Sequence, residues 1–247
     1  MISNFRKTRY GQLDTVVASH GEAGDLVTGV VVLCHGFGAP GTDLVPIAEE
    51  WFGSIPEFKG VRFVFPAAPL ELDPAYDARA WWEIDIERVQ QLMETGDFRE
   101  LRNSQPPRLA VCREMVEQLI AEVAKQWDVV PGQIVVGGFS QGAMLTTDLM
   151  LNAPCPLGGL ICWSGSLISE HQWRAAASAN VKTSVVQSHG TLDPILPFAG
   201  AEALRELLVE NGYQVEFVPF QGQHAIPPQA LTAAGQLIRR VCCPENG

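Results

Sequence analysis

Runs of consecutive apolar residues alternate along this chain with segments in which apolar residues recur every three or four positions. The first pattern is typical of strands that are buried on both faces, and the second of helices with one buried face. Residues 29–34 (GVVVLC) are the clearest strand, and residues 108–127 are the clearest helix. Their alternation predicts an α/β fold, with a mostly parallel central sheet and helices on both of its faces.

The same patterns place the remaining elements. Further strands are predicted at residues 61–65, 134–137, 158–163, 183–187 and 213–220, and further helices at 43–52, 198–210 and 228–241. Thr42 or Asp43 is expected to cap the first of these helices, and the proline-rich residues 66–76 are expected to form a loop. No repeat or linker divides the chain, so residues 1–247 are interpreted as a single domain.

Composition narrows the class of protein. The chain is 47% hydrophobic and 18% charged, as is typical of globular proteins. A formal net charge of -11 argues against nucleic acid or an anionic membrane surface as the main partner. The amino-terminal residues contain no long apolar run, so no signal peptide and no integral membrane segment is expected. The six cysteines show no metal-binding or disulfide spacing, which favours reduced thiols, a cytoplasmic location and no metal site.

The most specific chemical signal is the G-x-S-x-G sequence Gly138-Phe139-Ser140-Gln141-Gly142. An apolar, strand-like run ends at this sequence, and a helix-like segment follows it directly. This context is typical of a nucleophile elbow, in which a tight turn exposes the serine at the edge of a sheet. Small residues two positions before and after the serine leave room for the backbones that cross there. We therefore interpret Ser140 as a catalytic nucleophile.

A serine hydroxyl at neutral pH needs a base that accepts its proton and an acid that orients the base. In this kind of fold the partners follow in the order serine, acid, histidine. Asp193 comes after the strand predicted at 183–187, and His224 comes after the strand predicted at 213–220. Both are expected at the same edge of the sheet as the serine, so we predict that they are the acid and the base.

The remaining histidines fit the base less well. His20 lies in the polar amino-terminal region, and His171 lies in a helix-like segment. His35 and His189 end strands but precede the expected positions, so structural roles at the sheet edge are favoured for both. Among the acids, Asp148 falls within the helix that follows the elbow.

Ester or amide hydrolysis through a serine also needs hydrogen-bond donors for the oxyanion that develops on the substrate. The backbone N–H of Gln141, at the start of the helix after the nucleophile, is one expected donor. The second is expected from the glycine-rich loop at residues 35–38, most simply from the Phe37 N–H, because glycines give that loop its conformational freedom. A simple glycine turn without a catalytic role is the alternative.

Seven short motifs occur in a fixed order between about Val30 and about Ile238. They are Cys34-His35-Gly36-Phe37-Gly38, Phe65-Pro66-Ala67-Ala68-Pro69, Ala80-Trp81-Trp82-Glu83-Ile84, Gly138-Phe139-Ser140-Gln141-Gly142, Trp163-Ser164-Gly165, His189-Gly190-Thr191-Leu192-Asp193-Pro194-Ile195-Leu196-Pro197 and Gly222-Gln223-His224. Together they make the chain resemble the phospholipase/carboxylesterase (acyl-protein thioesterase-like) family of serine α/β-hydrolases. The resemblance covers nearly the whole chain, and the set is far more specific than any one motif.

The resemblance implies hydrolysis of carboxylic esters or thioesters without a metal or an organic cofactor. Position by position, it assigns Ser140, Asp193 and His224 to a catalytic triad. It assigns Phe37 and Gln141 to the oxyanion hole. The implied substrates are small acyl esters or thioesters, and the resemblance also permits a homodimer.

Two further residues fall where the family has residues near its acyl site, Trp81 and Ile195. Core packing is the alternative for Trp81, because adjacent residues on a strand point to opposite faces of a sheet. Residues 83–107 match the family poorly and are too long for a plain connection. They are interpreted either as a surface excursion with one extra helix or as a lid or rim over the acyl pocket.

Three functions remain open at this point. A carboxylesterase of short- or medium-chain acyl esters is the first. A lysophospholipase or acyl-protein thioesterase that acts on long acyl chains is the second, and it needs a longer apolar groove. The third belongs to another class, a binding protein with a hydrolase fold and no turnover.

Overall fold

A computed structural model describes residues 3–20, 25–85, 87–88 and 102–244. Its main feature is an eight-stranded sheet with the strand order β1-β2-β4-β3-β7-β8-β9-β10. The pairs from β4 to β10 are parallel, and β2 pairs antiparallel with both β1 and β4. The strands are β1 (Ser3–Tyr10), β2 (Leu13–His20), β3 (Gly29–Cys34), β4 (Val61–Pro66), β7 (Ile134–Phe139), β8 (Gly159–Trp163), β9 (Ser184–Gly190) and β10 (Gln214–Phe220).

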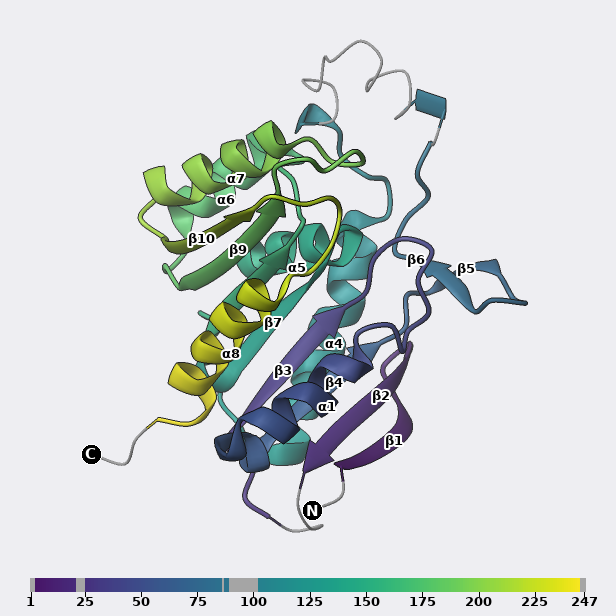
Figure 1. Ribbon diagram of the computed structural model, residues 1–247, viewed down its shortest axis with the longest axis vertical. Coiled ribbons are helices and arrows are strands. Elements are labelled where there is room, and N and C mark those ends of the chain that lie inside the picture. Colours follow the sequence, from purple (N-terminus) through teal and green to yellow (C-terminus); the bar gives the residue numbers. More distant parts are fainter. Residues whose placement is uncertain (1–2, 21–24, 86, 89–101, 245–247) are drawn as a thin grey trace.

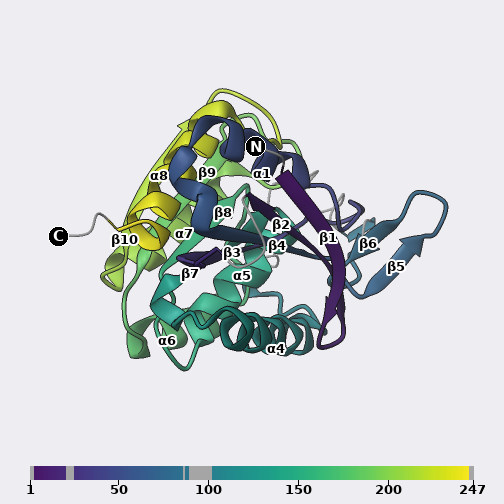
Figure 2. The same cartoon turned by 90° about the horizontal axis from the view of Figure 1, so that it is seen from below.

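Helices cover both faces of this sheet (Figures 1 and 2). Side chains of α1 and α8 pack in the core of one face, and side chains of α4 to α7 pack in the core of the other. The helices are α1 (Val45–Ser54), α4 (Leu109–Trp127), α5 (Gln141–Asn152), α6 (Glu170–Ala179), α7 (Phe198–Glu210) and α8 (Pro228–Cys242). Two short 3-10 helices, η1 (Pro56–Gly60) and η2 (Pro131–Gln133), precede β4 and β7. The α/β architecture predicted from the sequence is confirmed.

The central strand β3 shows why its sequence is a continuous apolar run. Val30 and Val32 point into the core under α4 to α7, whereas Val31 and Leu33 point into the core under α1 and α8. All four are buried, because neither face of a helix-covered parallel sheet is exposed to water. Complete burial of such a side chain contributes about 1.5–3 kcal/mol.

Three sequence predictions differ from the structure. Residues 66–76, predicted as loop, include β5 (Leu70–Asp73), which pairs with β6 (Ala78–Ala80) in a hairpin that projects from the body (Figure 2). This hairpin is largely exposed and has a register shift, so it leaves no apolar pattern in the sequence. The helix predicted from residue 43 begins at Val45, after backbone turns, and its N-cap Leu44 makes no side-chain capping bond. Neither Thr42 nor Asp43 is therefore the cap.

A buried ion pair connects the helices on one face. The Asp148 carboxylate on α5 is nearly buried and accepts hydrogen bonds from Arg113 Nη1 on α4 (2.9 Å) and Trp173 Nε1 on α6 (2.8 Å). The two oxygens of one side chain thus hold two neighbouring helices. Asn152 Nδ2, one turn further along α5, donates to the Asp148 carbonyl oxygen.

We expect Asp148→Ala to lower the free energy of unfolding by about 3 kcal/mol. It leaves the buried indole N–H of Trp173 without its partner, and it leaves the partly buried Arg113 guanidinium with its longer contact to Glu117 (3.5 Å). Urea unfolding at pH 7 measures the change. The matched control is Glu216→Ala, which removes an exposed ion pair with Arg240 (3.9 Å) and should cost less than about 0.5 kcal/mol. Equal losses in the two variants would show that burial of the Asp148 pair contributes nothing.

The topology brings four loops to one edge of the sheet. β3 and β7 are parallel neighbours, and so are β9 and β10. In a parallel sheet the loops that follow neighbouring strands lie side by side at the carboxyl edge. The segments that follow β3, β7, β9 and β10 are those in which the sequence places the candidate chemistry.

Candidate active site

The turn between β7 and α5 holds Ser140 in an unusual backbone conformation. Its φ of 53° and ψ of -115° lie outside the regions that L-residues prefer. The Ser140 N–H donates to the Trp163 carbonyl oxygen (2.9 Å), and the Ser140 carbonyl oxygen accepts the Met144 N–H (3.1 Å) as α5 begins. A Cβ at Gly138 or Gly142 would overlap with the backbone of β3 at the Cys34 carbonyl oxygen. The two glycines of the G-x-S-x-G sequence are therefore required by the strand that passes behind the turn.

Asp193 and His224 meet between the loops after β9 and β10. His224 Nδ1 lies 2.6 Å from Asp193 Oδ2, and the Asp193 side chain is completely buried. The other carboxylate oxygen, Oδ1, accepts the backbone N–H groups of Ile195 (2.8 Å) and Leu196 (2.9 Å). Burial alone would raise the pKa of Asp193, but the hydrogen bonds from His224 and from these two amides outweigh it and hold that pKa below its ordinary value.

Backbone hydrogen bonds fix the two loops to one another. The Thr191 N–H donates to the Phe220 carbonyl oxygen (2.8 Å), and the Leu192 N–H donates to the Gly222 carbonyl oxygen (3.0 Å). The ring of Phe139 packs against the His224 imidazole, with 4.7 Å between the ring centroids. The imidazole is thus held by an acid on one side and an aromatic ring on the other.

The two remaining histidines at this edge have structural contacts. His35 Nε2 accepts the Ala68 N–H (3.0 Å), so its Nδ1 carries the proton and donates to the Gly36 carbonyl oxygen (2.8 Å). His189 Nε2 donates to the Leu196 carbonyl oxygen (2.8 Å). Burial lowers the pKa of both imidazoles, in keeping with these neutral forms.

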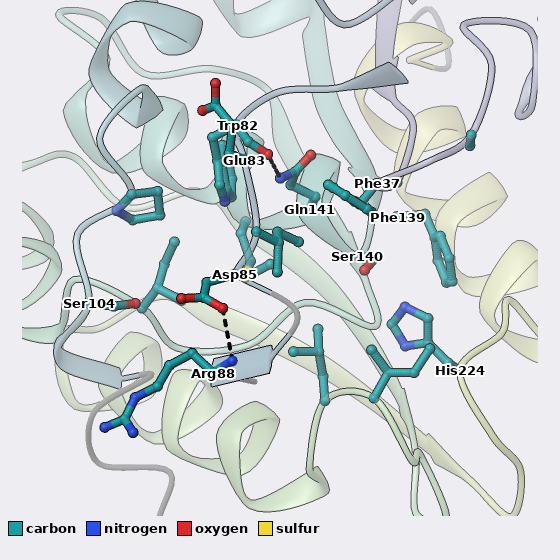
Figure 3. Close-up of a pocket in the computed structure, with 18 of the residues that line it drawn as sticks. Phe37, Trp82, Glu83, Asp85, Arg88, Ser104, Phe139, Ser140, Gln141 and His224 are labelled. Atoms are coloured by element: carbon teal, nitrogen blue, oxygen red, sulfur yellow. Dashed lines mark hydrogen bonds between the residues drawn. The ribbon is translucent and has the colours of Figure 1, made fainter. Parts of the chain in front are cut away.

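Ser140 and His224 open into one cavity of about 530 Å³. Figure 3 shows the Ser140 hydroxyl beside the His224 imidazole, with Ser104 across the cavity from both. The size is within the ordinary range for small-molecule sites. The apolar residues of the lining include Trp82, Ile84, Pro106, Pro107, Met144, Ile168, Ile195 and Leu196.

The cavity wall at residues 104–107 is fastened to the start of α6. The Ser104 carbonyl oxygen accepts both the backbone N–H (3.0 Å) and the hydroxyl (3.2 Å) of Ser169. Arg102 forms a two-pronged ion pair with Glu170, with N···O distances of 2.9 and 3.1 Å. Both ends of the stretch 83–107 therefore contribute to the cavity, whereas residues 86 and 89–101 lie outside the described part of the chain.

A family model described as Phospholipase/Carboxylesterase matches residues 16–242. The chain belongs to this family. Acyl-protein thioesterase 1 of Eremothecium gossypii is 31% identical to it over 216 residues, which cover 84% of this chain and 86% of that protein. A probable carboxylesterase of Oryza sativa subsp. japonica is 33% identical over 217 residues, which cover 85% and 87% of the two chains.

Solved structures agree with this assignment. The crystal structure of esterase PE8 has a TM-score of 0.77 and 25% identity, and the match covers 93% of this chain and 99% of that one. The carboxylesterase from Mesorhizobium loti has a TM-score of 0.72 at 18% identity, covering 94% and 97% of the two chains, which shows the shared fold. This member of the phospholipase/carboxylesterase family is therefore an α/β-hydrolase and a hydrolytic enzyme, which sets aside the non-catalytic alternative.

The structure places most of the predicted site residues around the cavity. Ser140, His224, Phe37, Gln141 and Ile195 all line it. Asp193 lies behind His224, and its side chain is completely buried. None of the helices in the described ranges is both long and apolar enough to cross a bilayer.

Trp81 is the exception. Its side chain is completely buried and is not part of the cavity lining, whereas Trp82 lines the cavity. The two tryptophans follow the end of β6 in a bend of the chain, and their side chains point to different surroundings. The structure therefore does not place Trp81 where it could reach a substrate in this cavity, and Trp82 takes that position in the lining.

Sequence reasoning missed two residues of the lining, Met144 and Ile168, and left a third part open. Met144 lies one helical turn after Ser140, so helical spacing alone could have placed it beside the nucleophile. Ile168 follows the carboxyl end of β8, which lies between β7 and β9, so the strand order could have placed it too. Residues 104–107 belong to the stretch 83–107, for which the sequence left a surface excursion and a rim of the acyl pocket open, and these four residues line the cavity.

Proposed function

We propose that this enzyme hydrolyses carboxylic esters of short- to medium-chain acyl groups through an acyl-enzyme intermediate on Ser140. The observation that carries the proposal is the 2.6 Å contact between His224 Nδ1 and Asp193 Oδ2, on an imidazole that shares a cavity with the Ser140 hydroxyl (Figure 3). The relatives named acyl-protein thioesterase and carboxylesterase support acyl hydrolysis.

In the proposed reaction, His224 Nε2 accepts the Ser140 proton as the hydroxyl oxygen attacks the ester carbonyl carbon. Asp193 keeps the proton of His224 on Nδ1 and stabilises the imidazolium that forms. The imidazolium then protonates the leaving alcohol or thiol, and the acyl group remains on the serine. Water, activated by the same imidazole, attacks the acyl-enzyme and releases the carboxylic acid.

The charge that develops on the substrate oxygen needs donors that are already in place. The Gln141 N–H is in the first turn of α5, where backbone N–H groups have no partner within the helix. The loop after β3 lies beside it, because β3 and β7 are neighbours, and Phe37 lines the cavity. The backbone N–H groups of Phe37 and Gln141 are therefore the proposed oxyanion hole.

The cavity supports an apolar acyl group of limited length. Ile168, Met144 and Trp82 supply apolar walls of the cavity into which Ser140 opens. Ser104 lies across the cavity from Ser140 (Figure 3), and Pro106 and Pro107 also line the cavity. An acyl chain that fits between these walls buries its methylene groups at about 0.8 kcal/mol each, whereas a longer chain has to leave through the mouth.

A second candidate is a thioesterase or lysophospholipase that acts on long acyl chains. The relatives named acyl-protein thioesterase 1 favour it. Hydrolysis of p-nitrophenyl esters from acetyl to palmitoyl separates the two candidates. A maximum of kcat/KM between acetyl and octanoyl would support the short-chain esterase, and a maximum at palmitoyl would overturn it in favour of the second candidate.

Narrowing the cavity tests where the acyl chain lies. We expect Ile168→Phe to lower kcat/KM for the octanoyl ester about tenfold and to leave the acetyl ester nearly unchanged, because a wrongly filled apolar pocket discriminates by about 1–3 kcal/mol. The matched control is Val130→Phe, an exposed position outside the cavity, which should change neither ester. Equal losses for the two esters in Ile168→Phe would contradict an acyl site against Ile168.

A further inference from the structure

A short segment, residues 79–82, is hydrogen-bonded both to the loop after β3 and to the first residue of α5, which supply the proposed oxyanion donors. At its start it pairs with the loop after β3. The Gly38 N–H donates to the Arg79 carbonyl oxygen (2.8 Å), and the Arg79 N–H donates to the Ala39 carbonyl oxygen (3.2 Å). The backbone directly after Phe37, at Gly38 and Ala39, is thus held by two hydrogen bonds.

Trp81 holds the same loop from its other side. Its indole Nε1–H donates to the His35 carbonyl oxygen (3.0 Å), two residues before Phe37. The Trp81 side chain and the His35 imidazole are both buried and pack with 5.6 Å between their ring centroids. The Phe37 peptide is therefore bracketed, by Trp81 before it and by Arg79 after it.

The Gln141 side chain connects this segment to the nucleophile turn. Gln141 Oε1 accepts the Trp81 N–H (2.9 Å), and Gln141 Nε2 donates to the Trp82 carbonyl oxygen (2.8 Å), as Figure 3 shows for the second bond. The Gln141 side chain is completely buried. The oxygen and the nitrogen of this buried amide are thus bonded to two consecutive residues, Trp81 and Trp82. Loss of either bond would leave a buried polar group without a hydrogen bond.

The two proposed donors are thus connected through one residue. The Phe37 loop is bonded to the Trp81 side chain, and the Gln141 residue is bonded to the Trp81 backbone. The remaining backbone acceptor of Trp81, its carbonyl oxygen, accepts the Cys112 thiol on α4 (2.9 Å). Every polar atom of Trp81 is therefore bonded to a different element around the site.

We propose that Trp81 is a positioning residue that sets the spacing between the two oxyanion donors, with the Gln141 side chain as its connection to the nucleophile turn. The inference rests on the proposed function, because it assumes that the Phe37 and Gln141 N–H groups bind the oxyanion. Donors act well only when their geometry is fixed before the charge develops. The cost of losing the connection therefore falls on the transition state and not on substrate binding.

The test is Trp81→Phe, which retains an aromatic ring and removes the indole N–H. We expect kcat for p-nitrophenyl acetate to fall about 10- to 100-fold, less than or comparable to the loss of one oxyanion donor, with KM changed less than about threefold. Inhibition by a trifluoromethyl ketone, whose adduct places an oxyanion in the hole, should weaken by a similar factor. The concentration of active sites in each variant is measured by labelling Ser140 to completion with a fluorophosphonate. Rates are divided by this concentration, so unfolded protein, which is not labelled, does not affect the comparison.

Trp173→Phe is the matched control. This substitution also removes a buried indole N–H, which donates to Asp148. Neither Trp173 nor Asp148 is part of the cavity lining. We expect the control to lose stability without a change of kcat or of ketone inhibition. Gln141→Met is the second variant if Trp81→Phe does not fold, because it keeps the Gln141 backbone N–H and removes both side-chain bonds.

The outcomes separate the inference from the proposed function. Wild-type protein that hydrolyses no ester and takes up no fluorophosphonate would overturn the proposed function, and the inference with it. An active wild type whose Trp81→Phe variant behaves like Trp173→Phe would overturn the inference alone. A loss in Trp81→Phe that falls entirely on KM would also overturn it, because it would place Trp81 in substrate binding.

Discussion

Replacement of Ser140 by alanine is expected to lower kcat for p-nitrophenyl esters by about 10⁴- to 10⁶-fold, as for other serine nucleophiles with an intact base and acid. The oxyanion donors and the acyl cavity remain in this variant, so binding of the substrate should change little. The fold should also be retained. Alanine carries the same Cβ as serine, so the φ of 53° at this position costs no more than before.

The measurement for Ser140→Ala combines turnover with covalent labelling. Wild-type protein should take up one fluorophosphonate group, located on Ser140 by peptide mass spectrometry, and the variant should take up none. Ser178→Ala is the control, because Ser178 is exposed and its hydroxyl donates to the Ala175 carbonyl oxygen of its own helix (2.9 Å). Residual turnover within tenfold of wild type would place the nucleophile elsewhere.

Asp193→Asn is expected to lower kcat by about 10⁴-fold without displacing His224. The N–H groups of Ile195 and Leu196 both point at Oδ1, so the amide oxygen of an asparagine takes that place. Its NH2 group then faces His224 Nδ1. An imidazole that accepts a hydrogen bond at Nδ1 carries its proton on Nε2, and it cannot accept the proton of Ser140.

The same substitution has a pH signature in stability. Because the pKa of Asp193 is held below its ordinary value in the folded protein, its ionisation stabilises the fold above a pH of about 4, the value for an unfolded chain. That contribution is lost as the pH falls through the lower, folded-state pKa. The difference in unfolding free energy between wild type and Asp193→Asn should therefore be largest near pH 7 and shrink toward pH 3.

Urea unfolding of both proteins at pH 7 and pH 3 tests this dependence. Asp14→Asn serves as the control, because Asp14 is exposed and lies 3.8 Å from an equally exposed Arg9. It should change stability little at either pH. A difference between wild type and Asp193→Asn that stays constant with pH would mean that the folded protein does not favour the ionised Asp193.

Buried elements could be predicted from the sequence more closely than exposed ones. The bounds predicted for β3 and α7 agree with the structure, because β3 is buried on both faces and α7 has a regular apolar stripe. The strands β1 and β2 were not predicted. β1 is an edge strand whose residues are mostly exposed, with Arg6, Lys7 and Arg9 among them, so it shows little of the burial that makes a strand visible in a sequence.

The candidate site follows the same division. Positions that depend on the ends of strands, such as Ser140, Asp193 and His224, could be placed from the sequence, because parallel strands bring their following loops together. The choice between Trp81 and Trp82 could not, since it depends on which face of one short segment meets the cavity. The Gln141 side-chain bonds to that segment join residues about 60 positions apart, and no local pattern encodes such a pair.

β3 passes directly behind the nucleophile turn, and the Cys34 carbonyl oxygen occupies the space that a Cβ at Gly138 or Gly142 would need. Directed evolution of this enzyme toward new esters would therefore find almost no productive variants at these two positions. Random substitutions are better concentrated at Met144 and Ile168, whose side chains line the cavity. The close crossing of β3 and the nucleophile turn thus separates the positions at which this enzyme can be redesigned from the two at which only glycine fits.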